Sequence, residues 1–264
     1  MLEIKNIYKT FNPGTINEKV ALNGLSLKLN EGDFVTVIGG NGAGKSTMLN
    51  AVSGVWPVDE GQIIIDGTDV TKLSEYKRAA YLGRVFQDPM TGTAATMGIE
   101  ENLALAKRRG KTRLLRPGIT KAERAEYKEL LKILNLGLED RLTSKVGLLS
   151  GGQRQALTLL MATLQKPKLL LLDEHTAALD PKTAAKVLDI TDKIVNRDHL
   201  TTLMITHNMK DAIAHGNRLI MMMNGKIVLD IQGEEKKKLT VKQLLDKFEE
   251  ASGEEFSNDS AILG

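Results

Sequence analysis

The segment GGNGAGKST, residues 39–47, decides how the rest of the sequence is interpreted. It fits the pattern G-x-x-x-x-G-K-[ST], follows the apolar run FVTVI and precedes the helical pattern STMLNAVS. Gly39, Gly42 and Gly44 allow the backbone to curl with its N–H groups turned inward, where they can surround a phosphate. A helix that starts directly behind the loop adds the positive end of its dipole. The alternative is a glycine-rich turn that matches the pattern by chance, and the flanking strand and helix count against it.

Lys45 and Ser46 supply the chemistry of this loop. Lys45 can reach the β- and γ-phosphates of a nucleotide, and the hydroxyl of Ser46 can coordinate Mg²⁺. The expected cofactors are therefore ATP and Mg²⁺. The nucleotide-binding residues expected in the loop are Gly39, Gly40, Asn41, Gly42, Ala43, Gly44, Lys45, Ser46 and Thr47.

Two acidic residues stand at the end of a second apolar strand, in the segment LLLLDE at residues 169–174. We expect Asp173 to hold Mg²⁺, directly or through water, and Glu174 to polarise the attacking water. Acids in this position can also merely cap the next helix. His207 again follows a buried strand, where a histidine is often a hydrogen-bonded core residue, but it can also donate to a γ-phosphate oxygen. Lys45, Glu174 and His207 are thus the predicted catalytic residues.

The composition limits the class of protein. The 264 residues, 42% hydrophobic and 26% charged, are typical of one large globular domain or of a core with a subdomain. A formal charge of +3 argues against a nucleic-acid partner, and the absence of cysteine excludes disulfides and thiolate metal sites. Apolar runs such as 169–173 and 219–223 are far shorter than the roughly 20 residues that span a bilayer. Any membrane role is therefore expected to depend on a partner.

Strand and helix patterns predict an α/β fold. Short alternating segments near the N-terminus indicate an antiparallel β segment, and later strands alternate with helices, which predicts a mostly parallel sheet. We therefore predict a P-loop NTPase core at about 1–86 and 165–235, interrupted by a helical subdomain at about 87–164. This domain, residues 1–235, is followed by a charged helical and mobile tail, 236–264.

The segment LLSGGQRQ at residues 148–155 precedes another helical pattern. Ser150 and the two glycines after it could present N–H groups and a hydroxyl to an anion, or could simply cap the helix. Because the chain already has a complete phosphate loop, a second anion-binding helix end needs its own explanation. With this segment, the sequence resembles the nucleotide-binding subunit of ATP-binding cassette (ABC) transporters, from about Leu2 to Asp230 and with the motifs in the family's order.

The resemblance implies a site shared between two chains. The signature residues that would contact the γ-phosphate of ATP held by a second copy are Ser150, Gly151, Gly152 and Gln153. Asp180 matches the D-loop, which crosses to that copy. One phosphate loop and one signature per chain imply a head-to-tail homodimer with two composite sites.

The resemblance assigns two more residues. Gln87, in VFQDP, is similar to the Q-loop glutamine, which touches Mg²⁺ or water and senses the membrane partner, so the implied metal ligands are Ser46, Gln87 and Asp173. Phe11 corresponds to the aromatic residue that stacks on adenine. Two alternatives stay open: Tyr8 could take this role, and Phe11 could belong to a small hydrophobic cluster.

Departures from the family's pattern indicate a distinct branch. His175 stands where proline is usual, Ala177 stands where serine is usual, and LTLLMATLQKP lacks a common arginine. The motifs resemble ATPase subunits of bacterial importers that work with an extracellular binding lipoprotein, of the tryptophan or tyrosine uptake type. The implied partners are a second copy, transmembrane permease subunits and, indirectly, the lipoprotein. The implied location is the cytoplasmic face of the bacterial cell membrane, and the implied cargo is a small solute such as an amino acid.

Other functions share these motifs. An ATPase of DNA repair or chromosome structure would carry a coiled-coil or zinc insertion, and the chain has no cysteine and no sustained heptads. A ribosome-associated relative would carry two cassettes. An exporter subunit and the ATPase of a soluble ABC-type complex stay open. The basic run from Lys107 to Arg116 is expected to be solvated surface, with contact to lipid headgroups or acidic loops as the alternative.

Overall fold

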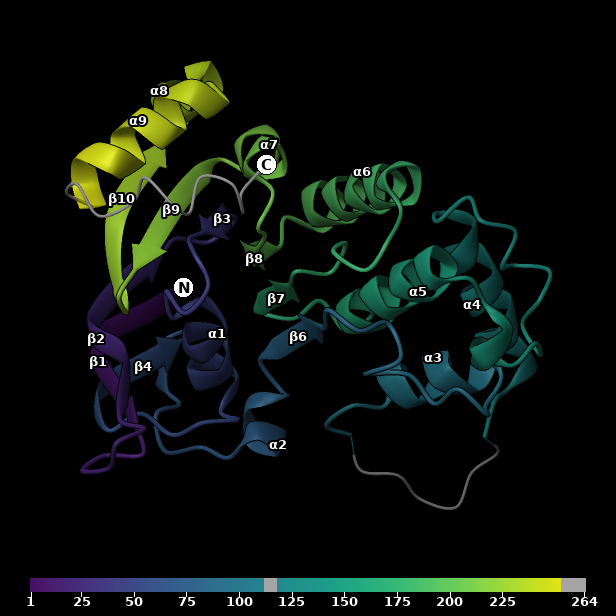
Figure 1. The fold of residues 1–264 in the computed structure, drawn as a ribbon. Helices are drawn as coiled ribbons and strands as arrows, with labels where there is room; N and C mark the ends of the chain where they lie inside the picture. The colour runs from purple at the N-terminus through teal and green to yellow at the C-terminus, as the bar shows by residue number, and fades with distance from the viewer. Residues whose placement is uncertain (112–117, 253–264) are drawn as a thin grey trace.

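Two β-sheets and a group of helices build the protein, shown in Figure 1 as a computed structural model that describes residues 1–111 and 118–252. The first sheet is antiparallel, with the strand order β2-β1-β4-β5. Its strands are β1 (Leu2–Phe11), β2 (Lys19–Leu29), β4 (Glu60–Ile65) and β5 (Thr68–Asp69). This sheet is the antiparallel β segment that the N-terminal alternation predicts.

The second sheet has the order β10-β9-β3-β8-β7-β6. All neighbours from β9 to β6 are parallel, and only β10 runs antiparallel to β9. The strands are β3 (Phe34–Ile38), β6 (Leu82–Val85), β7 (Leu169–Asp173), β8 (Thr201–Ile205), β9 (Arg218–Met223) and β10 (Lys226–Gln232). The prediction of an α/β fold with a mostly parallel sheet is confirmed.

The leucines of β7 explain why this strand is continuously apolar. Successive side chains of a strand point to opposite faces. Leu169 and Leu171 pack on the face that carries α1 (Lys45–Ser53) and the antiparallel sheet, whereas Leu170 and Leu172 pack with α5 (Gly151–Thr163) and α6 (Pro181–Asp198) on the other face. Both faces of the strand are therefore buried, and the polar groups at its carboxyl end are held between two packed layers.

The helices between β6 and β7 form the predicted helical insert. They are α3 (Ile99–Lys107), α4 (Lys121–Lys132), the 3₁₀ turn η1 (Val146–Leu148) and α5. Figure 1 shows this group on the side of the parallel sheet away from β1 and β2. The other helices described are α2 (Glu75–Arg78), α7 (Met209–Ala214), α8 (Gly233–Lys238) and α9 (Val241–Ser252).

The basic run 107–116 begins at the end of α3. Lys107 forms an ion pair with Glu126, and Arg108 lies 2.7 Å from a carboxylate oxygen of Glu123, both on α4. These two cations therefore contact acids within the chain. Residues 112–117 of the run lie outside the described residues.

The C-terminal segment begins with two helices. The boundary predicted at residue 235 falls inside α8, and the next helix, α9, buries Leu244 and Phe248 in a cluster with Leu219 and Met221 of β9. The apolar face of α9 needs cover, so the segment packs on the core. The predicted mobile end from residue 253 lies outside the described residues. Across 1–111 and 118–252, no helix is long and apolar enough to cross a membrane.

Candidate active site

The site lies at the carboxyl ends of three adjacent parallel strands. β8 pairs with β3 on one side and with β7 on the other, and Ile205 is the partner of both Val37 and Asp173. The phosphate loop follows β3, Glu174 follows β7 and His207 follows β8. Parallel strands therefore bring together three segments that are far apart in sequence, as expected for ligand sites of open α/β sheets.

Two glycines make the path of the phosphate loop possible. Gly44 has φ 100°, and a Cβ there would lie 2.5 Å from the carbonyl oxygen of Ala21. Gly39 has φ 149°, and a Cβ there would lie 2.2 Å from the carbonyl oxygen of Met222. These distances are shorter than any side chain tolerates against backbone, so only glycine fits at either position.

The loop leads into α1 with its first amide groups uncapped. The N-cap residue is Gly44, which has no side chain to accept hydrogen bonds from these groups. The first four N–H groups of a helix have no partner within the helix, and they carry the positive end of its dipole. The start of α1 is therefore suited to receive an anion.

Lys45 is buried beside this helix start. Its Nζ donates to the carbonyl oxygens of Gly39 at 2.6 Å and Gly40 at 3.1 Å. Burial lowers the pKa of the ammonium group, and the charges of Glu174 and Asp173 act in the opposite direction. An anionic phosphate would supply the compensating charge that a buried ammonium group needs.

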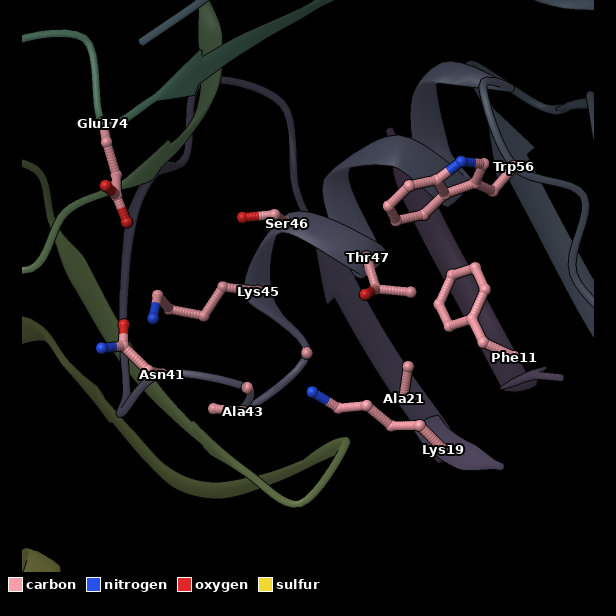
Figure 2. Close-up of a pocket in the computed structure, with 12 residues that line it drawn as sticks. Phe11, Lys19, Ala21, Asn41, Ala43, Lys45, Ser46, Thr47, Trp56 and Glu174 are labelled. Atoms are coloured by element: carbon pink, nitrogen blue, oxygen red, sulfur yellow. The ribbon is translucent and has the colours of Figure 1, made fainter. Parts of the chain in front are cut away.

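A cavity of about 320 Å³ opens in front of the loop (Figure 2). This volume is within the usual range for small-molecule sites. Lys45, Ser46 and Glu174 converge on one end of the cavity, and Phe11 and Trp56 lie at the other. The lining residues are Phe11, Lys19, Ala21, Asn41, Gly42, Ala43, Gly44, Lys45, Ser46, Thr47, Trp56 and Glu174.

The aromatic end of the cavity contains a residue that sequence reasoning missed. Trp56 packs edge to face on Phe11, with ring centroids 4.9 Å apart and an interplanar angle of 78°. Tyr8, the alternative to Phe11, points elsewhere, because its hydroxyl lies against Gly24. Trp56 follows the end of α1 outside any motif, so no sequence signal marked it.

Lys19 is a second residue that sequence reasoning missed. It lines the cavity from the start of β2, and its Nζ lies 3.2 Å from the point that a Cβ of Gly42 would occupy. Figure 2 shows the side chain extending toward the phosphate loop. The cavity therefore carries cations on two sides, Lys45 and Lys19, which suits a polyanionic ligand.

Glu174 occupies an unusual backbone conformation at the end of β7. Its φ of 44° is in the left-handed region, its N–H donates to Ile205 O at 3.0 Å, and its carbonyl accepts from Ala177 N at 2.9 Å. The carboxylate lies 3.8 Å from Nδ1 of the exposed His207. Strained conformations of this kind persist where neighbours fix the backbone, and they cluster at functional sites.

His175 is buried immediately after Glu174. Thr191 on α6 donates its hydroxyl proton to Val187 O at 2.9 Å, so the contact of 3.1 Å between His175 Nε2 and Thr191 Oγ1 has Nε2 as the donor. Burial, and then the nearby His215, lower the pKa of His175 to about 4. This side chain is therefore neutral at neutral pH, and it ties the segment after Glu174 to α6.

The donor set at the loop suits Mg²⁺ bound together with phosphates. The described residues contain no group of three or more His, Cys, Asp or Glu side chains that could hold a metal ion by itself. Mg²⁺ commonly takes one or two protein oxygens and completes its shell with water and substrate phosphates. The Ser46 hydroxyl and the Asp173 carboxylate are oxygen donors of this kind.

Several predicted residues lie away from the cavity. Gln87 is exposed on the loop after β6 and is not among the described lining residues. Ser150 is the N-cap of α5, where its Oγ accepts from Gln153 N at 3.3 Å and Gln153 Oε1 accepts from Ser150 N at 3.2 Å. Asp180 caps α6, and hydrogen bonds from Thr183 lower its pKa. The signature and D-loop residues therefore lie outside the cavity that holds Lys45.

Comparisons with known proteins agree with this geometry. The sequence profile of the ABC transporter family matches residues 22–177. A tyrosine transport ATP-binding protein of Clostridioides difficile (strain R20291) is 49% identical over 257 residues, which cover 95% of this chain and 100% of the relative. The methionine import ATP-binding protein MetN of Bartonella henselae is 34% identical over 232 residues, 86% of this chain and 64% of the relative.

A solved structure extends the likeness to the fold. The dimeric post-hydrolysis state of the ATP-binding cassette MJ0796, bound to ADP and Pi, matches with a TM-score of 0.74 and 30% sequence identity, over 88% of this chain and 98% of that chain. The chain that forms this cavity is thus similar to ATP-binding cassettes in both sequence and fold. The chain belongs to the ABC transporter family and contains its ATPase domain.

Proposed function

We propose that this chain is the ATPase subunit of an ABC importer, which hydrolyses ATP to drive a membrane permease. One observation carries the proposal. Lys45, Ser46 and Glu174 share a cavity with an uncapped helix start, whereas the second glycine-rich helix start, at Ser150, is outside that cavity. A chain with two glycine-rich helix starts, of which only the first lines this cavity, suits a head-to-tail pair, in which Ser150 to Gln153 of each copy complete the site of the other.

The lining residues suggest how ATP lies in the cavity. The adenine stacks on Phe11, whose orientation is fixed by Trp56. The triphosphate follows the loop toward Lys45, and Lys19 approaches it from the opposite side. Mg²⁺, when bound by Ser46 and Asp173, neutralises charge on the phosphate oxygens.

The protein residues then act on the attacking water and the transferring phosphoryl group. Glu174 is placed to orient the water and to accept its proton. Lys45 stabilises negative charge on the phosphoryl oxygens, and His207, 3.8 Å from the carboxylate of Glu174, donates to the same group. Gln87 reaches the site only when the loop after β6 moves, and this movement passes the state of the site to the permease.

The relatives support the transport assignment. The names of two of them refer to tyrosine transport and methionine import, and the match to the first covers 95% of this chain at 49% identity. We infer a small solute such as an amino acid as cargo, an extracellular binding lipoprotein that delivers it, and a position on the cytoplasmic face of the membrane. We also infer that residues 1–235 are the ATPase domain, with a core at about 1–86 and 165–235 and a helical subdomain at about 87–164.

Co-purification tests this proposal. The full chain is tagged, expressed in its native host and purified from detergent-solubilised membranes. The ATPase activity of the purified complex is then measured. We expect a multi-spanning membrane protein to co-purify in a complex that contains two copies of the chain. Recovery only in soluble complexes without such a protein would contradict the transport role, and transport assays in inside-out vesicles separate import from export.

A further inference from the structure

Arg84 makes an unusual set of contacts behind the phosphate loop. It lies on β6, and its side chain is only 13% exposed. Its Nη2 lies 3.1 Å from Asp173 Oδ2 and 2.8 Å from Asn50 Oδ1, and its Nη1 lies 3.1 Å from Ser53 Oγ. The guanidinium group therefore bonds to the end of β7 and to α1 at the same time.

These contacts connect two residues that are predicted to bind Mg²⁺. Ser46 and Asn50 are four residues apart on α1, a spacing that puts both on one side of the helix. Arg84 contacts both Asn50 and Asp173 through Nη2, and it contacts Ser53 through Nη1. Because such a group is rigid, the position of the Asp173 carboxylate is set relative to the helix that carries Ser46.

Burying the charge of Arg84 carries a free-energy cost. Arg84 Nε is buried without a hydrogen-bond partner among the described residues, and the guanidinium carbon lies 4.6 Å from the ring centroid of Phe86. A buried cation costs free energy that an apolar side chain of similar size would avoid. Gln87 follows three residues after Arg84, on the loop after β6.

We infer that Arg84 is a positioning residue for the Mg²⁺ site, which holds the Asp173 carboxylate at a fixed place relative to Ser46. The inference rests on the proposed binding of Mg²⁺ and nucleotide in this cavity. Arg84 engages Oδ2 of Asp173, so Oδ1 is the oxygen available to the metal or to a water bound to it. Arg84 itself is not among the residues that line the cavity.

The test separates metal affinity from nucleotide affinity and from stability. Binding of a non-hydrolysable ATP analogue is measured by calorimetry with excess EDTA and then at increasing Mg²⁺ concentrations. For Arg84→Met we expect the Mg²⁺ concentration at half-maximal enhancement of binding to rise about tenfold, as is typical when a residue that orients a metal ligand is removed. Binding in EDTA is expected to stay unchanged. Arg84→Lys, which keeps the charge but not the planar group, should give a smaller rise.

A second variant tests the contact between Arg84 and α1 instead of the arginine itself. Asn50→Ala removes one contact between Arg84 and α1, while Arg84 and Asp173 stay intact, and we expect a rise in the same direction. Arg124→Met is the matched control, because Arg124 on α4 also makes an ion pair, with Glu100 at 2.6 Å, but belongs to the helical insert. It should lower the melting temperature and leave the Mg²⁺ requirement unchanged.

The outcomes are distinct. A Mg²⁺ requirement that is unchanged or lower in Arg84→Met, while wild type shows Mg²⁺-dependent binding, overturns the positioning role and leaves the proposed function intact. A wild-type chain that binds no nucleotide with Mg²⁺ overturns both. If Arg84→Met does not fold, the Mg²⁺ requirement of Asn50→Ala and Arg84→Lys decides instead, and an unchanged requirement in both overturns the positioning role.

Discussion

The N-termini of α1 and α5 both follow glycine-rich segments, but they differ in how their amide groups are used. At α1, Gly44 offers no side chain, and the amide groups face a cavity that also contains Lys45 and Glu174. At α5, Ser150 and Gln153 bond to each other's backbone and close the end of the helix. The first end is open within one chain, whereas the second is closed by its own capping box.

The largest expected effect concerns the open end. Glu174→Gln removes the group that accepts the proton from water but keeps its shape, so we expect steady-state ATP hydrolysis to fall by about a hundredfold or more. Nucleotide binding should persist. Glu129→Gln, the same change at an exposed ion pair on α4, is the control and should hydrolyse ATP at the wild-type rate. Robust turnover by Glu174→Gln would remove this residue from the mechanism.

The next largest effect is on stability, when one glycine at the N-terminus of α1 or of α5 is replaced. Gly44→Ala forces a Cβ to 2.5 Å from Ala21 O at φ 100°, and we expect the free energy of unfolding to fall by about 2 kcal/mol or more. Gly151→Ala meets only Leu179 Cδ2, at 3.2 Å, and should change stability by less than about 0.5 kcal/mol. Urea unfolding of the two variants measures both values. Equal losses would mean that the two ends are equally constrained within one chain.

A third effect concerns the base at the open end. Phe11→Ala removes the stacking surface, so we expect the affinity for ATP and ADP to fall about tenfold while the affinity for tripolyphosphate stays constant. Tyr8→Ala is the matched control, because Tyr8 packs against Gly24 instead of lining the cavity. Calorimetry with the three ligands distinguishes a contact with the base from a general loss of the cavity. If Tyr8→Ala weakens ATP binding more than Phe11→Ala, the two aromatic roles are reversed.

The smallest effect concerns the closed end. Ser150→Ala opens the capping box of α5 and should cost about 1 kcal/mol of stability. The affinity of the isolated chain for ADP should stay unchanged, because Ser150 does not line the cavity. A drop in ADP affinity would mean that α5 contributes to the site of its own chain.

Sequence patterns predicted the fold class because its signals are local. The phosphate loop lies between a buried strand and a helix, and the consecutive leucines of β7 indicate a strand that is buried on both faces. The packing of α9 on β9 was not predicted, because it depends on contacts distant in sequence. Sheet order is not local either, which is why Arg84 on the edge strand β6 could not be connected to Asp173 on β7 in advance.

The same limit applies to the cavity walls. Lys19 and Trp56 belong to no motif, and they line the same cavity as the phosphate loop only because β2 and the segment after α1 pack beside that loop. Gly39 to Thr47, by contrast, are consecutive, so one segment of sequence contains most of the predicted nucleotide contacts. Residues that are consecutive in a motif could thus be assigned to the nucleotide site from the sequence, whereas isolated residues could not.

The packing of Trp56 on Phe11 has an experimental consequence. The chain contains one tryptophan, so its whole indole fluorescence originates at the wall of the nucleotide cavity. Loading and release of nucleotide can be followed in the unlabelled, native chain by emission intensity and quencher access. The chain therefore carries its own optical probe, and rapid-mixing records can time each turnover without a dye.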